Sequence, residues 1–159
     1  MQCHHANVVH RDLASRNFLV MKDLTVKLSD FGLSKFNRTS MNVAVDAHGS
    51  PLKWMSPEAC ELHQFSHASD VWSLGVVLWE IAHDGEQPYA GIPHQEAVRQ
   101  VVANQTQLRC DHAPTRYQQI MQSCFARKPG ARPAAKAVVS ELKMIYDDCT
   151  TTLAKLSHT

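Results

Sequence analysis

Polar side chains that can carry chemistry gather in the segment VVHRDLASRN, which runs from position 8 to position 17. They are His10, Arg11, Asp12, Arg16 and Asn17. A further carboxylate, Asp30, follows later in the chain. Carboxylate and amide oxygens are hard ligands that suit Mg²⁺, which usually takes one or two protein groups beside waters and substrate phosphates. Asn17 and Asp30 are therefore a candidate metal-binding pair, and the carboxylate of Asp12 is expected to lie close to them.

A short β-hairpin is the element that must bring these groups together. Residues 18–21 and 25–29 are strand-like, and the turn residues 22–24 separate them. In an antiparallel pair the start of the first strand lies beside the end of the second. Asn17 precedes the first strand and Asp30 follows the second, so their side chains are expected to converge. Taken singly, each residue is explained as well by a capped turn with solvated acids, and the metal hypothesis depends on the set.

The rest of the chain predicts helices, after a loop that is expected to span residues 32–50. Ser56 and Pro57 are typical of a helix N-cap and first helical position. Residues 70–81 are apolar on nearly every side, which predicts a buried central helix.

Three amphipathic helices are expected after the central one. The first begins near Pro93, and the second begins after Thr115, which would form a capping box with Gln118. The third begins at Pro133, and the chain is expected to fray from Thr150 onward. The apolar positions expected on this last helix are Val138, Leu142, Ile145 and Tyr146.

Composition restricts the class of protein. The 159 residues suit one domain, and 44% hydrophobic with 19% charged residues is an ordinary globular balance. A formal net charge of +1 gives no reason to expect a nucleic-acid or membrane partner. The five cysteines are odd in number and lack C-x-x-C spacing, which is typical of reduced cytosolic thiols.

Three motifs occur together and in order: HRDLASRN at 10–17, DFG at 30–32 and SPE at 56–58. The set resembles the H-R-D-L-x-x-x-N, D-F-G and A-P-E motifs of protein kinases. Ala14, Arg16, the segment PLKWM at 51–55 and SDVWSLGVVLWEI at 69–81 resemble the tyrosine kinases within that family. The resemblance implies a mainly α fold with a small β-hairpin: a kinase C-terminal lobe over residues 1–149, with a tail at 150–159.

The resemblance also implies roles for the residues of the site. Asp12 is expected to be the catalytic base, Arg16 to orient the substrate tyrosine, and Asn17 and Asp30 to hold Mg²⁺ on the phosphates of ATP. The implied substrate is a tyrosine side chain of a protein. Phe31 and Gly32 are expected to set the state of the loop that follows them.

The same resemblance implies structural roles for three further charged residues. Glu58 is expected to pair with Arg132, and Asp70 to brace the backbone of the HRD segment. Such charges are tolerated in an interior only when they are paired.

The chain departs from the family in two places. No glycine-rich loop, strand lysine or partner glutamate precedes His10, because only nine residues do. The N-terminal lobe is therefore expected to be missing. The loop after Gly32 contains no tyrosine, and Asn42 stands where the regulatory tyrosine is usual.

Three hypotheses remain open. The chain is the catalytic lobe of a tyrosine kinase, a non-catalytic truncated lobe that acts as a binding or decoy module, or a gene-model fragment of a larger kinase. The expected location is cytoplasmic, either free or as the intracellular part of a membrane receptor, with no direct membrane contact from this segment.

Overall fold

The computed structural model describes residues 7–36, 52–105 and 107–156 of the chain. Its helices are α2 (Pro57–Leu62), α3 (His67–Ala82), α4 (His94–Val102), α5 (Thr115–Cys124) and α6 (Ala135–Leu156). Its strands are β1 (Val8–Val9), β2 (Phe18–Val20), β3 (Val26–Leu28) and β4 (Lys35–Phe36). Single 3-10 turns cover Ser15–Asn17, Leu52–Trp54 and Pro129–Ala131. The predicted fold class, mainly α with a small β-hairpin, is confirmed.

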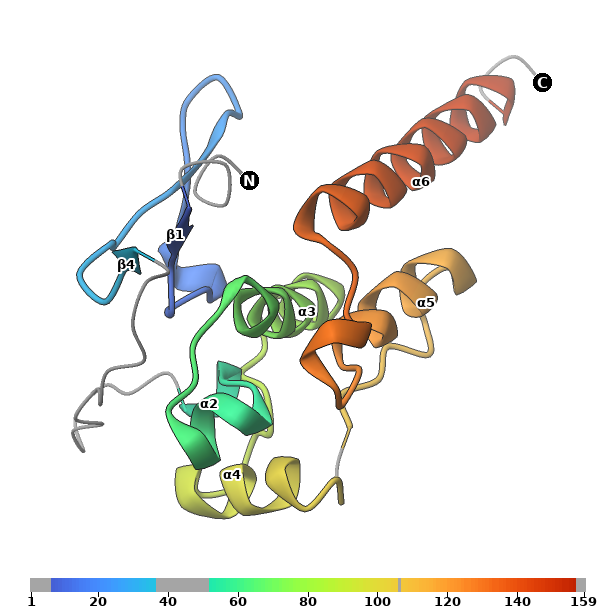
Figure 1. Cartoon of the computed structure of the whole chain (residues 1–159). Coiled ribbons are helices and arrows are strands. Elements are labelled where there is room, and N and C mark those ends of the chain that lie inside the picture. The colour runs from blue at the N-terminus through green and yellow to red at the C-terminus, as the bar shows by residue number, and fades with distance from the viewer. Residues whose placement is uncertain (1–6, 37–51, 106, 157–159) are drawn as a thin grey trace.

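Helix α3 lies at the centre of the molecule, as the apolar run predicts (Figure 1). It begins after Ser66, whose Oγ accepts a hydrogen bond from the backbone N–H of Ser69, while the Oγ of Ser69 accepts one from the N–H of Ser66. This reciprocal pair satisfies donors that the first turn of a helix leaves free. The helix is not buried on every side, because Ile81 is 62% exposed.

Close packing between α3 and α5 depends on Gly75. A Cβ atom at this position would lie 2.7 Å from the Cβ of Cys124, well inside a van der Waals contact. The absence of a side chain therefore lets α5 approach the central helix. The rings of Trp72 and Phe125 meet edge to face beside this contact, with centroids 5.1 Å apart.

Helices α5 and α6 begin or end at residues other than those predicted. Pro114, not Thr115, occupies the N-cap of α5, and no side chain caps it; Gln118 instead donates to the carbonyl oxygen of Ala113 at 2.7 Å. Helix α6 begins at Ala135 rather than Pro133, and it continues through Thr150 to Leu156. The predicted capping box and the predicted fraying from Thr150 are wrong for these residues.

The predicted hairpin is confirmed as β2 and β3. Phe18 pairs with Leu28 and Val20 with Val26 in an antiparallel ladder. A second ladder, β1 with β4, pairs Val8 with Phe36. This ladder lies partly in the segment predicted to be loop; the remainder of that segment, residues 37–51, lies outside the described residues.

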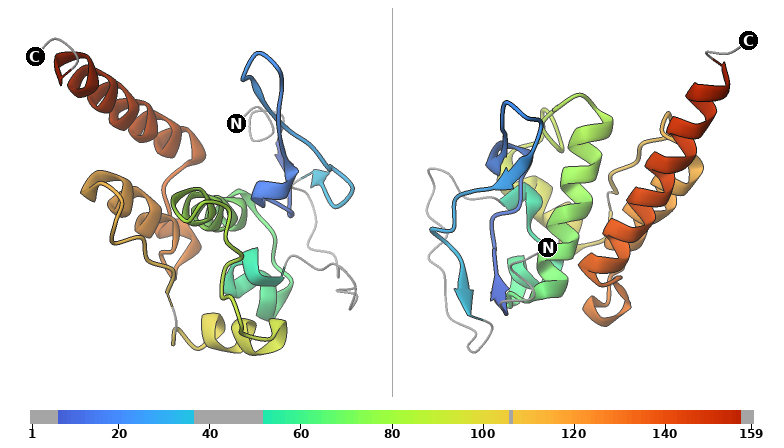
Figure 2. Two further views of the ribbon diagram at one scale, coloured as in Figure 1. Left: turned by 180° about the vertical axis from the view of Figure 1, so that it is seen from behind. Right: turned by 90° about the horizontal axis from the view of Figure 1, so that it is seen from above.

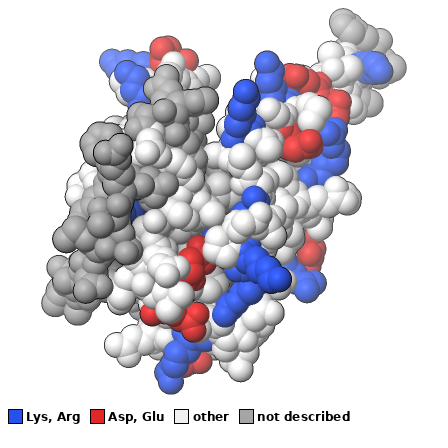
Figure 3. Space-filling view, in the orientation of Figure 1, with Lys and Arg blue, Asp and Glu red and all other residues white. Residues whose placement is uncertain are grey.

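The hairpin and α6 occupy opposite sides of α3 (Figures 1 and 2). The C-terminal end of α6 projects beyond the other elements in these views. Basic and acidic side chains alternate along the visible face of this helix (Figure 3).

Candidate active site

A buried carboxylate of α3 holds the start of the HRD loop, by which we mean residues 10–17. Asp70 is 1% exposed, and its two oxygens accept hydrogen bonds from the backbone N–H groups of His10 at 2.8 Å and Arg11 at 3.0 Å. Arg11 has a φ of 72°, a left-handed conformation that is costly for a residue with a side chain. The predicted bracing by Asp70 is confirmed, and it holds the backbone immediately before Asp12 in this strained form.

Asp12 is held from its other side by the end of the same loop. Arg16 Nη2 lies 2.5 Å from Asp12 Oδ1, and Asn17 Nδ2 donates to the carbonyl oxygen of Asp12 at 2.8 Å. The guanidinium of Arg16 also stacks over the Trp54 ring, 4.7 Å from its centroid. Asp12 and Asn17 are buried, so these contacts restrict the orientation of the Asp12 carboxylate.

Sequence reasoning missed Glu80, a second buried carboxylate of α3 that holds this loop. Its Oε2 accepts from the backbone N–H of Ser15 at 2.9 Å and from Trp54 Nε1 at 2.9 Å. Its Oε1 accepts from the hydroxyl of Ser15 at 2.7 Å. One carboxylate thus joins the HRD loop to the segment that carries Trp54. The available signal was an acidic residue inside an otherwise apolar helix, because a buried carboxylate needs partners.

The hairpin places Asp30 near the HRD loop by its backbone. The N–H and the hydroxyl of Ser29 both donate to the carbonyl oxygen of Asn17 at 2.9 Å, so the residue before Asp30 lies directly beside Asn17. Asp30 itself is exposed, has a φ of 58° and accepts from the N–H of Gly32 at 3.2 Å. Convergence of the Asn17 and Asp30 side chains on a metal ion stays a prediction.

The chemistry of these two groups fits a magnesium ion. The amide nitrogen of Asn17 is committed to the carbonyl of Asp12, so its Oδ1 is the atom left for a cation. Only Oδ1 of Asp30 accepts a hydrogen bond within the described part of the chain, which leaves Oδ2. Two oxygen ligands of this kind, with waters and phosphates completing the shell, meet the usual requirement of Mg²⁺.

Phe31 contacts the HRD loop at its histidine. The rings of Phe31 and His10 meet edge to face with centroids 4.8 Å apart, and His10 Nε2 lies 3.2 Å from the carbonyl oxygen of Ser29. His10 is fully buried, whereas Phe31 is half exposed. The ring of Phe31 therefore packs on the loop from outside.

The predicted pair of Glu58 and Arg132 is confirmed as a bidentate contact. The two guanidinium nitrogens lie 2.6 and 2.8 Å from the two carboxylate oxygens, and Arg132 also stacks over the Trp72 ring. Burial alone raises the pKa of Glu58, but the hydrogen bonds and charge of Arg132 outweigh burial, and the pKa ends below its ordinary value. The pair fastens α2 to the turn before α6.

Lys53 is a second residue that sequence reasoning did not single out. Its side chain is buried, and its Nζ donates to the carbonyl oxygen of Tyr89 at 2.9 Å. Burial lowers the pKa of this ammonium group. This hydrogen bond thus fixes the 3-10 turn Leu52–Trp54, which precedes α2, to the turn before α4.

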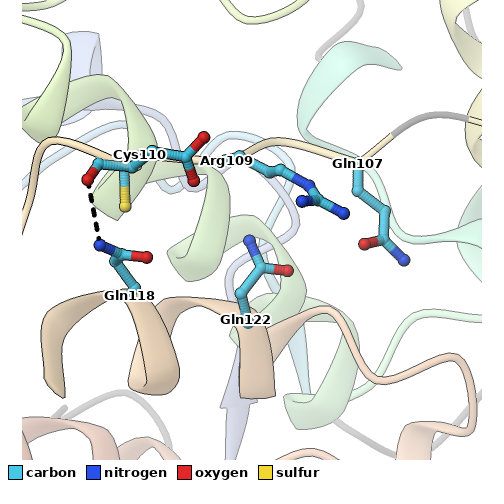
Figure 4. A pocket seen from close by; sticks show the side chains of 6 residues that line it. Gln107, Arg109, Cys110, Gln118 and Gln122 are labelled. Atoms are coloured by element: carbon cyan, nitrogen blue, oxygen red, sulfur yellow. Dashed lines mark hydrogen bonds between the residues drawn. The ribbon is translucent and has the colours of Figure 1, made fainter. Parts of the chain in front are cut away.

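A polar pocket of about 270 Å³ lies away from this site, between α5 and the chain that precedes it (Figure 4). It is lined by Gln107, Arg109, Cys110, Asp111, Gln118 and Gln122. Two of its amides already bind the backbone: Gln122 donates to Leu108 at 2.6 Å and Gln118 to Asp111 at 3.3 Å. None of the predicted site residues lines it, and Gln118 and Gln122 serve to hold the preceding loop to α5.

Within the described residues, no helix has both the length and the apolar character needed to cross a bilayer.

Comparison with known proteins agrees with the motifs. A sequence profile described as protein tyrosine and serine/threonine kinase matches residues 2–142. The chain is 39% identical over 140 residues to ephrin type-B receptor 3 of Xenopus laevis. The aligned residues cover 86% of this chain and 14% of the receptor. It is 39% identical over 136 residues to insulin-like growth factor 1 receptor of Bos taurus, and these residues cover 85% of this chain and 21% of that protein.

A third relative is the megakaryocyte-associated tyrosine-protein kinase of Mus musculus, 40% identical over 135 residues, or 85% of this chain and 26% of that protein. The chain thus spans roughly a seventh to a quarter of the length of these three relatives. The residues matched by the kinase profile nevertheless include all three motifs and helix α3. The chain therefore belongs to the protein tyrosine and serine/threonine kinase family, and its fold is that of the C-terminal lobe of the kinase domain.

Proposed function

We propose that the chain is the catalytic-loop-bearing lobe of a protein tyrosine kinase, which transfers the γ-phosphoryl group of ATP to a tyrosine hydroxyl of a protein. Asp12 accepts the hydroxyl proton, and Arg16 positions the Asp12 carboxylate and the incoming tyrosine. Such a lobe works in the cytoplasm, either in a free enzyme or in the intracellular part of a receptor. The three relatives named above, two of them receptors and one a tyrosine-protein kinase, support this proposal.

The observation that carries the proposal is the double restraint on Asp12. Asp70 fixes the backbone before it, while Arg16 and Asn17 fix its carboxylate and its carbonyl. Phosphoryl transfer requires little covalent chemistry from the protein and depends on positioning and charge stabilisation. A carboxylate preset in this way suits a base that must meet a substrate hydroxyl at one point.

Asn17 and Asp30 would hold the metal ion in this proposal. When bound, Mg²⁺ neutralises charge on the phosphates of ATP. The contribution of the chain is to present the two oxygen ligands from adjacent strand ends, with Ser29 bonded to Asn17 between them. This arrangement ties the ligand positions to the same backbone that holds Asp12.

The test joins the chain to the ATP-binding N-terminal lobe and the following helix of a tyrosine kinase. We expect the joined protein to phosphorylate a tyrosine peptide, and to need no phosphotyrosine in the loop after Gly32. Asp12→Asn should abolish turnover with little change in nucleotide affinity, because Asp12 faces the hydroxyl rather than ATP.

Asp111→Asn, an exposed aspartate on the loop before α5, is the matched control and should retain turnover. A joined protein that binds MgATP without transferring phosphate, or full turnover in Asp12→Asn, would contradict the proposal.

A second candidate is a non-catalytic binding module, and the hairpin favours it. Four apolar side chains on or beside β2 and β3 are more than half exposed: Leu19, Val20, Leu24 and Val26. Exposed apolar groups gathered in this way mark a surface that another polypeptide covers. Unaided, the chain offers MgATP little beyond Asn17 and Asp30, so we expect weak binding by calorimetry. A micromolar dissociation constant of the isolated chain for MgATP would favour the catalytic hypothesis over the non-catalytic binding module.

A further inference from the structure

The three tyrosines of the chain lie in very different surroundings. Tyr89 is 8% exposed, and burial raises its pKa. Tyr117 donates its hydroxyl to the carbonyl oxygen of Leu78 at 2.7 Å, and burial raises its pKa to about 12. Tyr146 is 67% exposed on α6. The prediction that Tyr146 belongs to the apolar face of its helix is therefore wrong.

We propose that Tyr146 is a phosphorylation site, so that this lobe is itself a substrate of a tyrosine kinase. In the reaction Tyr146 Oη forms a bond to the γ-phosphorus of ATP, the bond from that phosphorus to the β–γ bridging oxygen breaks, and ADP leaves. The hydroxyl proton passes to the base carboxylate of the donor enzyme. The inference rests on the proposed function only where the donor is a second copy, whose base would be Asp12.

Helix α6 can release this tyrosine at small cost. From Lys143 onward no described side chain of the helix is buried, and Ile145 alone is half-buried. The ion pairs that fasten this end join Arg116 to Glu141 at 3.2 Å and to Asp148 at 2.8 Å, and all three side chains are substantially exposed. Exposed pairs contribute little, and segments with few buried contacts open locally before the core does. Tyr146 can therefore become extended in a donor site while the rest of the lobe stays folded.

The other two tyrosines lack this freedom. Tyr89 lies in the same buried cluster as Trp54 and Val101. The hydroxyl of Tyr117 is already bound to the central helix. Either one could reach a donor enzyme only if α3 and the elements around it separated.

The charges around Tyr146 indicate what the phosphate would do. Asp147 and Asp148 follow it directly, and Lys143 lies one turn earlier, at the i−3 spacing that makes neighbours on a helix. Arg116 contacts Met144 and Asp148, each two residues from Tyr146 and so on the opposite face. A phosphate there adds a charge of about −1.5 to −2 to a turn that already carries two carboxylates, and Lys143 can neutralise only one unit of it. Phosphorylation is therefore expected to loosen the last turns of α6.

The test uses the full 159-residue chain, MgATP and an unrelated, active tyrosine kinase as donor, with sites assigned by peptide mass spectrometry. We expect a single phosphate, on Tyr146. Tyr146→Phe should reduce incorporation to background, and Tyr117→Phe should leave it unchanged. Circular dichroism of Tyr146→Phe should match the parent, because Phe at an exposed position removes only a hydroxyl. Tyr117→Phe loses one hydrogen bond to Leu78, which contributes only modestly to stability, so its spectrum should also show the helices in place.

A second measurement keeps the two proposals separate. Hydrogen exchange should become faster in residues 147–156 of the phosphorylated chain and stay unchanged in α3. Phosphate on Tyr89 or Tyr117, phosphate spread over all three, or none while a control peptide in the same tube is modified would overturn the inference. Because the donor is unrelated, each of these results leaves the catalytic proposal for Asp12 standing.

Discussion

The HRD loop and the end of the hairpin supply the same candidate site, but the protein holds them in opposite ways. Two buried carboxylates of α3 bind the loop: Asp70 at its start and Glu80 near its end. Asp30 is exposed, and its side chain accepts a hydrogen bond from the N–H of Gly32, two residues away. The hairpin around it exposes apolar groups such as Leu24.

The difference indicates which part of the site this lobe organises alone. Buried hydrogen-bonded carboxylates fix a backbone because leaving either partner unpaired is costly. The HRD loop is therefore set by α3, whether or not a substrate is present. Asp30 has no such support in the described residues, so no buried group of this lobe fixes the position of its carboxylate.

The largest expected effect comes from breaking the support of the loop with Asp70→Ala. Removing this acceptor leaves the N–H groups of His10 and Arg11 buried and unpaired, at roughly 1–3 kcal/mol each. We expect the free energy of unfolding in urea to fall by about 2–6 kcal/mol. Asp70→Asn retains one acceptor and should lose about half as much, and Asp84→Asn is the exposed control. Equal stability of all three variants would show that Asp70 does not brace the loop.

Glu58→Gln extends the comparison to the buried pair at α2, with an expected loss of about 2–3 kcal/mol near neutral pH. The folded pKa of Glu58 lies below its ordinary value of about 4.3. Its contribution is therefore full above that value and is lost as the pH falls through the folded pKa. Urea titrations should show the parent losing stability below about pH 4.3, with a smaller loss in the variant. Parallel curves for the two proteins would rule out this role.

Glu80→Gln tests the second carboxylate that holds the HRD loop, with a smaller expected loss of stability than Asp70→Ala. One amide oxygen can replace only part of the three hydrogen bonds made to Ser15 and Trp54, so we expect a loss of about 1–2 kcal/mol. The indole N–H resonance of Trp54 should shift, because its acceptor changes from a charged to a neutral oxygen. Glu86→Gln, at an exposed position, is the control. An unmoved Trp54 resonance would argue against the bond.

The smallest expected effect is that of Asp30→Asn on folding. Asparagine tolerates a left-handed backbone, and the side chain is exposed, so stability should stay within about 0.5 kcal/mol of the parent. In the joined, active protein the same change should sharply reduce magnesium-dependent turnover. A loss of stability as large as that of Glu80→Gln would mean that Asp30 is held as firmly as the loop, and the comparison would fail.

Much of the architecture could be predicted because its signals are local. The strand-like residues 18–21 and 25–29 with a turn between them predict the β2–β3 hairpin. The apolar run predicts α3, since a helix that is apolar on nearly every side is buried. Helix ends were less predictable. Thr115 has the right residue type for an N-cap, yet Pro114 takes that position with a non-helical backbone, a shift of one residue that is ordinary at helix ends.

The sequence by itself determined the motif set, because residue types at fixed spacing carry that information, and the motifs indicated the family. The Asp70 brace and the Glu58–Arg132 pair were predicted through the resemblance to that family. Only the tertiary structure decided that Glu80 serves Ser15 and Trp54 together, that β1 pairs with β4, and that Tyr146 faces solvent. The partners in these contacts are brought together by the packing of α3 against the loop or by the direction in which α6 leaves the core. Local sequence spacing does not specify such long-range directions, and a tyrosine at a helical apolar position is buried only if another element covers it.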